Sequence, residues 1–560
     1  MIGERRYSFI SNIYFKTIVT SIALTYLFKL STVSIFPLFI AVLAYYFYKI
    51  NADCKIQNEA KWCGALLALF LTLGEPDLLL NIKRNMVKIF ALLMGSGFFL
   101  SCLLQIFYDL YDKYLSDSTP LEQAYNKIAV VSLTAFGWLL VCWIPYWLAC
   151  YPAVLTPDSI SQIKQVLGLA PLVNHHPIAH TMTLKLMYEF ISSCGVQDIN
   201  AIIGFISFIQ LLFLAVCFTL VVRFIYVKTG NRLLVCLILL YYGLVSFHGY
   251  YSVTIWKDIT HGAITVLLLL ALVKALSFSG HMNSKSAVLY VSLFLLCCAF
   301  CLFRSNGYYA LLLWLPFLIL FSYKFKKYYL VAVVFLAIIF SSYVKGPFYE
   351  SLGVRDAKFS EKLSIPLQQI AYVVKNNRPL TEKQKYLLEQ IIDVRRIPRL
   401  YKPYISDPIK GNCRNGEFFA ANKWEYFQMW FDLGIKYPKD YLIAWLHQTR
   451  GYWYPNIKYW VYGKGVKKND IGLERSPIAV NKVIEKISLE KIWGLGAFYN
   501  VAAYTWVLLV MLSFAVARRN WSVALCYLLL CSIFFSLLLG TPVFAEFRYY
   551  LNCTQENGHS

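Results

Sequence analysis

Five short polar motifs interrupt the apolar runs of this sequence, and each carries ionisable side chains suited to chemistry. An ionised side chain costs about 2.5–3.5 kcal/mol at the centre of a lipid-embedded helix, so its presence in an apolar chain is informative. Together the motifs supply a carboxylate, imidazoles and several cations, which are the groups that deprotonate a hydroxyl and stabilise a departing anion. The motifs are Thr156-Pro157-Asp158-Ser159, Asn174-His175-His176-Pro177, Trp256-Lys257-Asp258, Arg304-Ser305-Asn306-Gly307 and Glu546-Phe547-Arg548-Tyr549.

Asp158 is the candidate general base, because it is the only acid between Glu122 and Glu189. A structural interpretation stands beside the catalytic one. Thr156 has the side chain of a helix N-cap and Pro157 suits the first helical position, so Asp158 would be a first-turn acid that complements the helix dipole. The two interpretations are compatible, and the sequence favours neither.

The adjacent histidines His175 and His176 are candidate substrate ligands. Asn174 is expected to cap the following helix, which would place His176 and His180 one turn apart on its face. An i,i+4 histidine pair can bind a divalent metal, but Asp158 is the only acid nearby. The sequence therefore favours a site without a metal or another cofactor.

Lys257 and Arg304 lie where apolar runs begin or end, and they are candidate ligands for an anionic substrate. Each residue taken singly is also explained as an interfacial side chain whose charge reaches out to water. The complete set of candidate substrate-binding residues is His175, His176, Lys257, Asp258, Arg304, Asn306, Glu546 and Arg548.

The composition indicates which elements hold these residues. The chain is 59% hydrophobic and only 15% charged, with a mean hydropathy of +0.54, whereas a soluble domain carries about 25% charge. The net charge of +23 is concentrated in short loops and in one long polar segment, as the positive-inside rule produces, so nucleic-acid binding is not expected. Most of the 15 cysteines lie in apolar runs, where cysteine acts as a small hydrophobe and predicts no disulfide framework.

The sequence therefore predicts an all-α integral membrane protein, a polytopic bundle of about 12–13 transmembrane helices with juxtamembrane helices and one large extramembrane loop. Residues 1–126 form N-terminal spans, 127–345 a core with a first outer loop at 149–200, 346–493 the large loop, and 494–560 the last spans and a tail. The apolar runs are Ile13–Lys29, Ser31–Lys49, Trp62–Leu80, Val87–Tyr108, Lys127–Leu148, Ala201–Val227, Leu233–Ser246, Ile259–Leu276, Ala287–Phe303, Gly307–Phe321, Tyr328–Tyr343, Leu495–Ala517 and Trp521–Leu539.

Lysines and arginines in the short loops predict which way the bundle faces. If most of these clusters of Lys and Arg lie in the cytoplasm, successive helices cross the membrane in alternating directions, provided that Ile178–Cys194 lies along the membrane surface. All five motifs then share the extracytoplasmic face of the cytoplasmic membrane, with the large loop. The cluster Lys83, Arg84 and Lys88 does not fit, because it would also face outward. The apolar run before it, Trp62–Leu80, is interrupted by Gly74–Asp77 and is expected to form a re-entrant hairpin.

The order of the motifs resembles the GT-C superfamily of integral-membrane glycosyltransferases, and more narrowly an uncharacterised bacterial membrane-protein family assigned to that fold. An aspartate in an early outer loop precedes an amphipathic helix, a His-Pro element and a surface helix. The resemblance covers about Lys127 to Tyr550. Two features depart from it: no apolar run follows Tyr549, and the aspartate is single, where some relatives have two adjacent acids.

The resemblance implies a hexosyl- or pentosyltransferase that moves a sugar from a polyprenyl-phosphate donor in the bilayer to an envelope glycan, lipid or protein. Attack on the sugar's anomeric carbon passes through an oxocarbenium-like state, and the departing phosphate gains charge. A transporter or flippase for a lipid-linked saccharide is the alternative, although its polar groups would lie near the bilayer midplane. The third hypothesis is a membrane protein that binds its ligand without catalysing a reaction.

Overall fold

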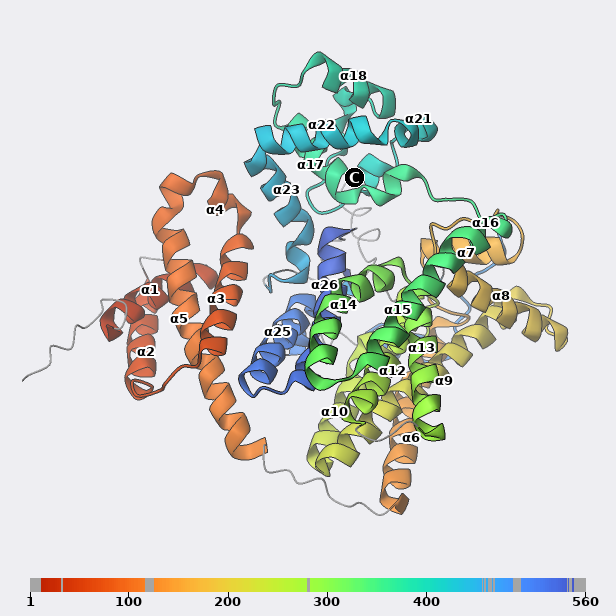
Figure 1. The fold of residues 1–560 in the computed structure, drawn as a ribbon, viewed down its shortest axis with the longest axis horizontal. Coiled ribbons are helices and arrows are strands. Elements are labelled where there is room, and N and C mark those ends of the chain that lie inside the picture. Colours follow the sequence, from red (N-terminus) through yellow and green to blue (C-terminus); the bar gives the residue numbers. More distant parts are fainter. Residues whose placement is uncertain are drawn as a thin grey trace, which may run out of the picture.

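Helices make up almost the whole of the computed structural model (Figure 1). The structure describes residues 12–31, 34–115, 125–278, 283–455, 457, 460–461, 466, 469–486, 495–540, 542 and 546–547. Within this part of the chain the strands are β1 (Trp460–Val461) and β2 (Glu546–Phe547), which pair in parallel.

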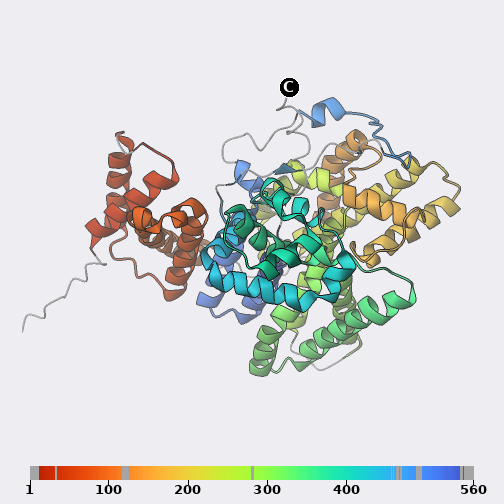
Figure 2. The ribbon, with the colours of Figure 1, turned by 90° about the horizontal axis from the view of Figure 1, so that it is seen from above.

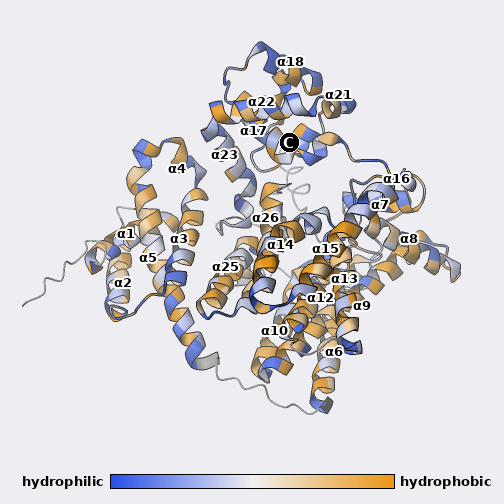
Figure 3. Cartoon of the chain, in the orientation of Figure 1, coloured by the Kyte–Doolittle hydropathy of each residue, from blue (hydrophilic) through white to orange (hydrophobic). Residues whose placement is uncertain are grey.

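All thirteen apolar runs contain helices, but fewer of the described helices than the predicted 12–13 are long enough to span a membrane. Eight helices are long and apolar enough to cross a membrane, and the pair α10 (Arg232–Leu244) and α11 (Ser246–Ser252), bent by 61°, would make a ninth. Among the described residues the chain is therefore a polytopic helical membrane protein. Figure 3 shows the hydrophobic residues concentrated along these helices. The eight are α5 (Ile82–Leu115), α6 (Tyr125–Cys150), α9 (Ile199–Thr229), α12 (Lys257–Ser277), α13 (Ser284–Leu302), α14 (Ser305–Phe325), α15 (Tyr328–Tyr343) with its continuation to Ser351, and α26 (Trp521–Leu539).

The remaining apolar runs give shorter helices. They are α1 (Ile13–Leu27), α2 (Phe36–Ile50), α3 (Asn58–Leu73) and α25 (Val501–Ala517). The predicted run Trp62–Leu80 is not one span, because α3 ends at Leu73 and the short α4 (Pro76–Leu80) turns the chain back into α5. Gly74 at this corner lies so close to Tyr454 that a Cβ would come within 2.1 Å of the ring.

The corner at α4 lies at the same end of the bundle as the large loop. Lys439, in α23 (Pro438–Thr449) of that loop, donates a hydrogen bond to the carbonyl of Leu80 at 2.6 Å. Lys83 and Arg84 lie in the first turn of α5, at the same end of the bundle as the large loop. These two basic residues therefore still depart from the positive-inside pattern of the other clusters. At its other end α5 contacts Arg518, which forms an ion pair with Asp112.

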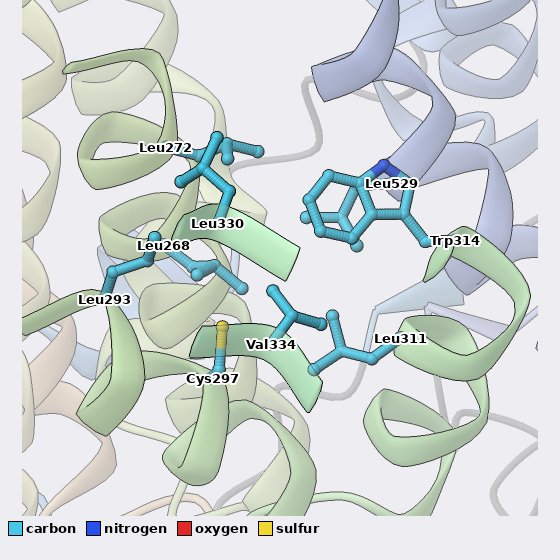
Figure 4. Close-up of a pocket in the computed structure, with 9 residues that line it drawn as sticks. All are labelled: Leu268, Leu272, Leu293, Cys297, Leu311, Trp314, Leu330, Val334 and Leu529. Atoms are coloured by element: carbon cyan, nitrogen blue, oxygen red, sulfur yellow. The ribbon is translucent and has the colours of Figure 1, made fainter. Parts of the chain in front are cut away.

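The bundle core is packed with apolar side chains from α12, α13, α14, α15 and α26. Trp314 is fully buried there, and its indole donates to the carbonyl of Leu525 at 2.9 Å. Figure 4 shows apolar side chains converging on a gap that leaves no room for a water molecule. Cys298 and Cys301, spaced as C-x-x-C in α13, are free thiols in this core.

The large loop is a helical domain with its own hydrophobic core, centred on residues such as Leu388, Phe419 and Leu433. Figure 2, viewed from above, shows its helices over the middle of the bundle. Its described elements before α23 are η3 (Phe359–Lys362), α17 (Ser364–Lys375), α18 (Glu382–Ile391), η4 (Val394–Arg396), α19 (Ile397–Leu400), α20 (Asp407–Lys410), α21 (Gly416–Ala421) and α22 (Lys423–Lys436), and after it η5 (Arg450–Tyr452), β1 and α24 (Asn481–Ile484). The short η7 (Leu495–Tyr499) follows the loop and leads into α25.

Two short helices lie between α6 and α9, namely α7 (Pro157–Val166) and α8 (Ile178–Ser193). The 16 residues of α8 do not qualify as a span, and Figure 1 shows α8 extending sideways from the bundle. This agrees with a helix that does not cross the bilayer.

The sidedness predicted from the basic clusters is testable by labelling. We expect Lys385→Cys, in the large loop, to react with a membrane-impermeant maleimide in intact cells, and Lys285→Cys, at the opposite end of α13 from Arg304, to react only after lysis. Both lysines are exposed. Both cysteine substitutions are made in a variant in which the exposed Cys194 and Cys236 are replaced by serine. The reverse pattern would place the polar motifs on the cytoplasmic side.

Candidate functional site

The candidate site is built where two helices begin side by side. Val154 and Thr254 form a parallel bridge, although a hundred residues separate them in sequence, and this bridge aligns the starts of α7 and α12. Thr156 and Ser159 form a capping box at the start of α7, as expected for Thr156. Ser159 also donates to the carbonyl of Ile255, which joins the two helix starts.

Asp158 and Lys257 lie in the first turns of α7 and α12 and form an ion pair. Lys257 Nζ is 3.0 Å from Asp158 Oδ2 and 3.1 Å from His176 Nδ1, and the two charged side chains are only 12% and 17% exposed. An ammonium group has no lone pair, so Lys257 donates to both neighbours. His176 Nδ1 must then accept, which leaves its ring proton on Nε2. The structure thus joins three of the predicted residues in one hydrogen-bonded cluster.

A second ion pair joins Arg304, at the N-cap of α14, to Asp258, the residue after Lys257. The Asp258 carboxylate is 12% exposed and the Arg304 side chain 27%. Lys257 and Arg304 are therefore not isolated cations, because each is held against a carboxylate at the end of the bundle.

Asn306 and Gly307 begin α14 beside this pair. A Cβ on Gly307 would lie 2.1 Å from the carbonyl oxygen of Phe300, so only glycine lets α14 approach α13 this closely. The Asn306 amide nitrogen is buried and has no hydrogen-bond partner among the described residues. A buried donor without a partner costs stability, and it marks a place where a ligand oxygen would be accepted.

We expect Gly307→Ala to destabilise the protein by about 1–3 kcal/mol, because the added methyl group overlaps the backbone of α13. Gly262→Ala is the matched control, since a Cβ there would have nothing within 4 Å and alanine favours a helix. Thermal unfolding in detergent should show a lower midpoint for the first variant and an equal or higher midpoint for the second. Equal midpoints would mean that α13 and α14 can move apart without cost.

The large loop contacts the segment that carries His175 and His176, through a backbone hydrogen bond and through charged side chains. Asn174 N–H donates to the carbonyl of Arg355 at 2.8 Å, so Asn174 does not cap α8, whose N-cap residue is Pro177. The rings of His175 and His176 are 4.6 Å apart.

Burial lowers the pKa of His175, and the charges of Lys257 and Lys410 act in the same direction against the opposing effect of Glu361. Lys410 and Glu361, both from the large loop, form an ion pair at 2.9 Å. His175 therefore lies between the bundle cluster and an ion pair of the loop domain.

His180 is fully buried in α8, and its Nδ1 lies 3.1 Å from the Gln162 side-chain oxygen. Burial, with a further contribution from Lys257, lowers the pKa of His180 to about 4 from the ordinary 6.5. The folded protein binds fewer protons than the unfolded chain between these two pKa values, so stability present above pH 6.5 is lost as the pH falls.

At pH 5 we expect this loss to be about 2 kcal/mol. His180→Asn keeps a donor toward Gln162 but does not titrate. Unfolding of both proteins in detergent, followed from pH 7.5 to 5, should therefore show a smaller loss of stability for the variant. Parallel pH curves would contradict a neutral, buried His180.

The C-terminal motif is described only in part. Glu546 lies in β2, opposite Trp460, and no contact of its side chain is described. Arg548 lies outside the described residues. Whether these two residues join the cluster stays a prediction.

No group of three or more His, Cys, Asp or Glu side chains within the described ranges is arranged to hold a metal ion. A groove of about 460 Å³ lies elsewhere, between α3 and α25, with Glu59 and Ser513 on its walls. It belongs to a different part of the molecule from Asp158 and Lys257.

Comparison with known proteins gives a family but no function. Residues 167–543, about two thirds of the chain, match a family model described as a family of unknown function, DUF6020. The chain belongs to DUF6020. No curated protein and no solved structure matches it. The DUF6020 match includes His175, Lys257 and Arg304, begins after Asp158 and ends before Glu546.

The structure adds residues to the site of this DUF6020 protein that the sequence did not single out. Glu361 and Lys410 come from the large loop, and Lys345 lies at the end of the span that begins with α15. Lys345 could have been predicted from the sequence, because Lys345-Gly346-Pro347 places a charge and a helix breaker directly after an apolar run.

Proposed function

We propose that this DUF6020 protein is a GT-C-type glycosyltransferase that moves a sugar from a polyprenyl-phosphate donor to an acceptor hydroxyl on the extracytoplasmic face of the membrane. The observation that carries the proposal is the cluster of Asp158, Lys257 and His176 at the helix ends, directly beside the Asp258–Arg304 pair.

The chemistry follows from these groups. Asp158 accepts the proton of the acceptor hydroxyl as its oxygen bonds to the anomeric carbon of the sugar. The bond from that carbon to the phosphate oxygen breaks, and the electron pair leaves with the lipid phosphate. Arg304 and Lys257 stabilise the new charge in a site that excludes much of the water, and His176 Nε2–H is a further donor.

The position of the cluster at the bundle end suits a lipid-linked donor, because its chain stays in the bilayer while its phosphate lies at the interface. A transporter would place such groups near the middle of broken helices. Asp158, Lys257 and Arg304 lie instead at or within the first turn of three separate helices.

The test is a transfer assay with the purified protein in nanodiscs. A panel of polyprenyl-phosphate hexoses and pentoses, radiolabelled in the sugar, is offered with membrane lipids and envelope glycans as acceptors. We expect one donor to be consumed with formation of free polyprenyl phosphate and a labelled product. Donor crossing the bilayer of proteoliposomes intact, with no bond cleavage, would replace this proposal with the transporter.

A further inference from the structure

Lys345 is a charged residue at the end of a membrane-spanning helix, and it lies in an unusual backbone. Residues Val344–Phe348 form a π-helical turn that continues α15, with Pro347 inside it. A π-helical turn in a longer helix is rare and often marks a functional site, because it redirects side chains at the cost of regular hydrogen bonds.

The ammonium group of Lys345 contacts an aromatic ring. It lies over the ring of Tyr308, 5.4 Å from the centroid. Among the described residues it takes part in no ion pair. Tyr308 lies in the first turn of α14, whose N-cap residue is Arg304. Lys345 therefore lies at the same end of α14 as the Asp258–Arg304 pair.

Lys345 differs in its pairing from the two other cations of the site. Lys257 and Arg304 each form an ion pair, with Asp158 and Asp258. Lys345 has no ion-pair partner among the described residues. A half-buried ammonium group that lacks an anionic partner is costly near lipid, and an anionic ligand would remove that cost.

The neighbouring surface indicates from which side such an anion comes. Tyr343 and Phe348 flank Lys345 in sequence and are 58% and 44% exposed, and Tyr309 in α14 is 58% exposed. Aromatic side chains of this kind are typical of the membrane–water interface. A hydrogen bond of 2.9 Å between the hydroxyl groups of Tyr308 and Ser342 joins α14 to α15 beside Lys345.

We propose that Lys345 binds the phosphate of a lipid that enters from the bilayer beside α14 and α15, and that this lipid is the polyprenyl-phosphate donor. This inference rests on the proposed function for the identity of the lipid. Asn306, with its buried amide donor at the start of α14, offers a second contact for a phosphate oxygen. Lys345 thereby positions the donor, whereas Asp158 acts on the acceptor.

The experiment measures binding and needs no turnover. The full-length protein is placed in phosphatidylcholine nanodiscs, and its affinity is measured for a long-chain polyprenyl phosphate, for the corresponding polyprenol and for phosphatidylglycerol. We expect Lys345→Gln to weaken polyprenyl-phosphate binding by about tenfold and to leave polyprenol binding unchanged. Lys345→Arg should keep most of the affinity, and Lys285→Gln, at the opposite end of α13, should keep all of it.

A second measurement uses the unaltered protein. A polyprenyl phosphate carrying a photoreactive group next to the phosphate should label a peptide that contains residues 341–351. Labelling confined to other helices would overturn the assignment, even if Lys345→Gln did not fold.

The outcomes separate the inference from the proposed function. Equal polyprenyl-phosphate affinity of Lys345→Gln and the parent overturns the role of Lys345 and leaves the transferase intact. Binding of phosphatidylglycerol alone, lost in Lys345→Gln, overturns the polyprenyl donor and supports a lipid-phosphate site. If the parent binds neither lipid, both proposals are wrong.

Discussion

Asp158→Asn is expected to abolish sugar transfer, with a loss of about 10²–10⁴-fold, while the protein still inserts in the membrane. The variant also leaves the mostly buried Lys257 ammonium group without its carboxylate, so its stability should fall and transfer is measured at a temperature at which the variant is folded. An amide has the shape of the carboxylate but cannot accept the acceptor's proton. The start of α7 does not depend on the charge, because Thr156 and Ser159 cap it by themselves. This arrangement separates the catalytic interpretation of Asp158 from the structural one, which the sequence left open.

Asp198→Asn is the matched control for this experiment. Asp198 is an acid of the same loop region, and its side chain caps α9 by accepting from Ala201 N–H at 2.8 Å. Asparagine is an equally good N-cap, so this variant should transfer sugar at the rate of the parent. Transfer by folded Asp158→Asn within a few-fold of the parent would remove Asp158 from the mechanism.

Much of the fold was accessible from sequence because its signals are local. Runs of apolar residues must form helices in lipid, and all thirteen do. The capping role of Thr156 was also local, since Thr156-Pro157 has the side chain and the backbone angle that start a helix. Asn174 shows the limit of such reasoning, because its backbone pairs with Arg355 of the large loop, far away in sequence.

The pairing of charges could not be predicted in the same way. Five motifs suggested a common surface, but which acid meets which cation depends on the bridge between Val154 and Thr254. That bridge places Lys257 against Asp158 and leaves Asp258 for Arg304. Such tertiary contacts have no counterpart in the local pattern of either segment.

The second large effect is expected at Arg304, and a double substitution distinguishes its two possible roles. Arg304→Gln should lower transfer by about 10²–10³-fold if the guanidinium stabilises the departing phosphate. It should also destabilise the protein by roughly 3–5 kcal/mol, because it leaves the mostly buried Asp258 carboxylate without its cation.

Adding Asp258→Asn to Arg304→Gln removes the uncompensated charge, so thermal stability should return close to that of the parent. Transfer should stay low in the double variant, since no guanidinium faces the phosphate. Arg304→Lys should keep the ion pair yet lose part of the rate, because lysine lacks the two parallel donors of arginine. Recovery of transfer together with stability in the double variant would show that Arg304 serves only to pair with Asp258. The phosphate would then depend on Lys257 and Lys345.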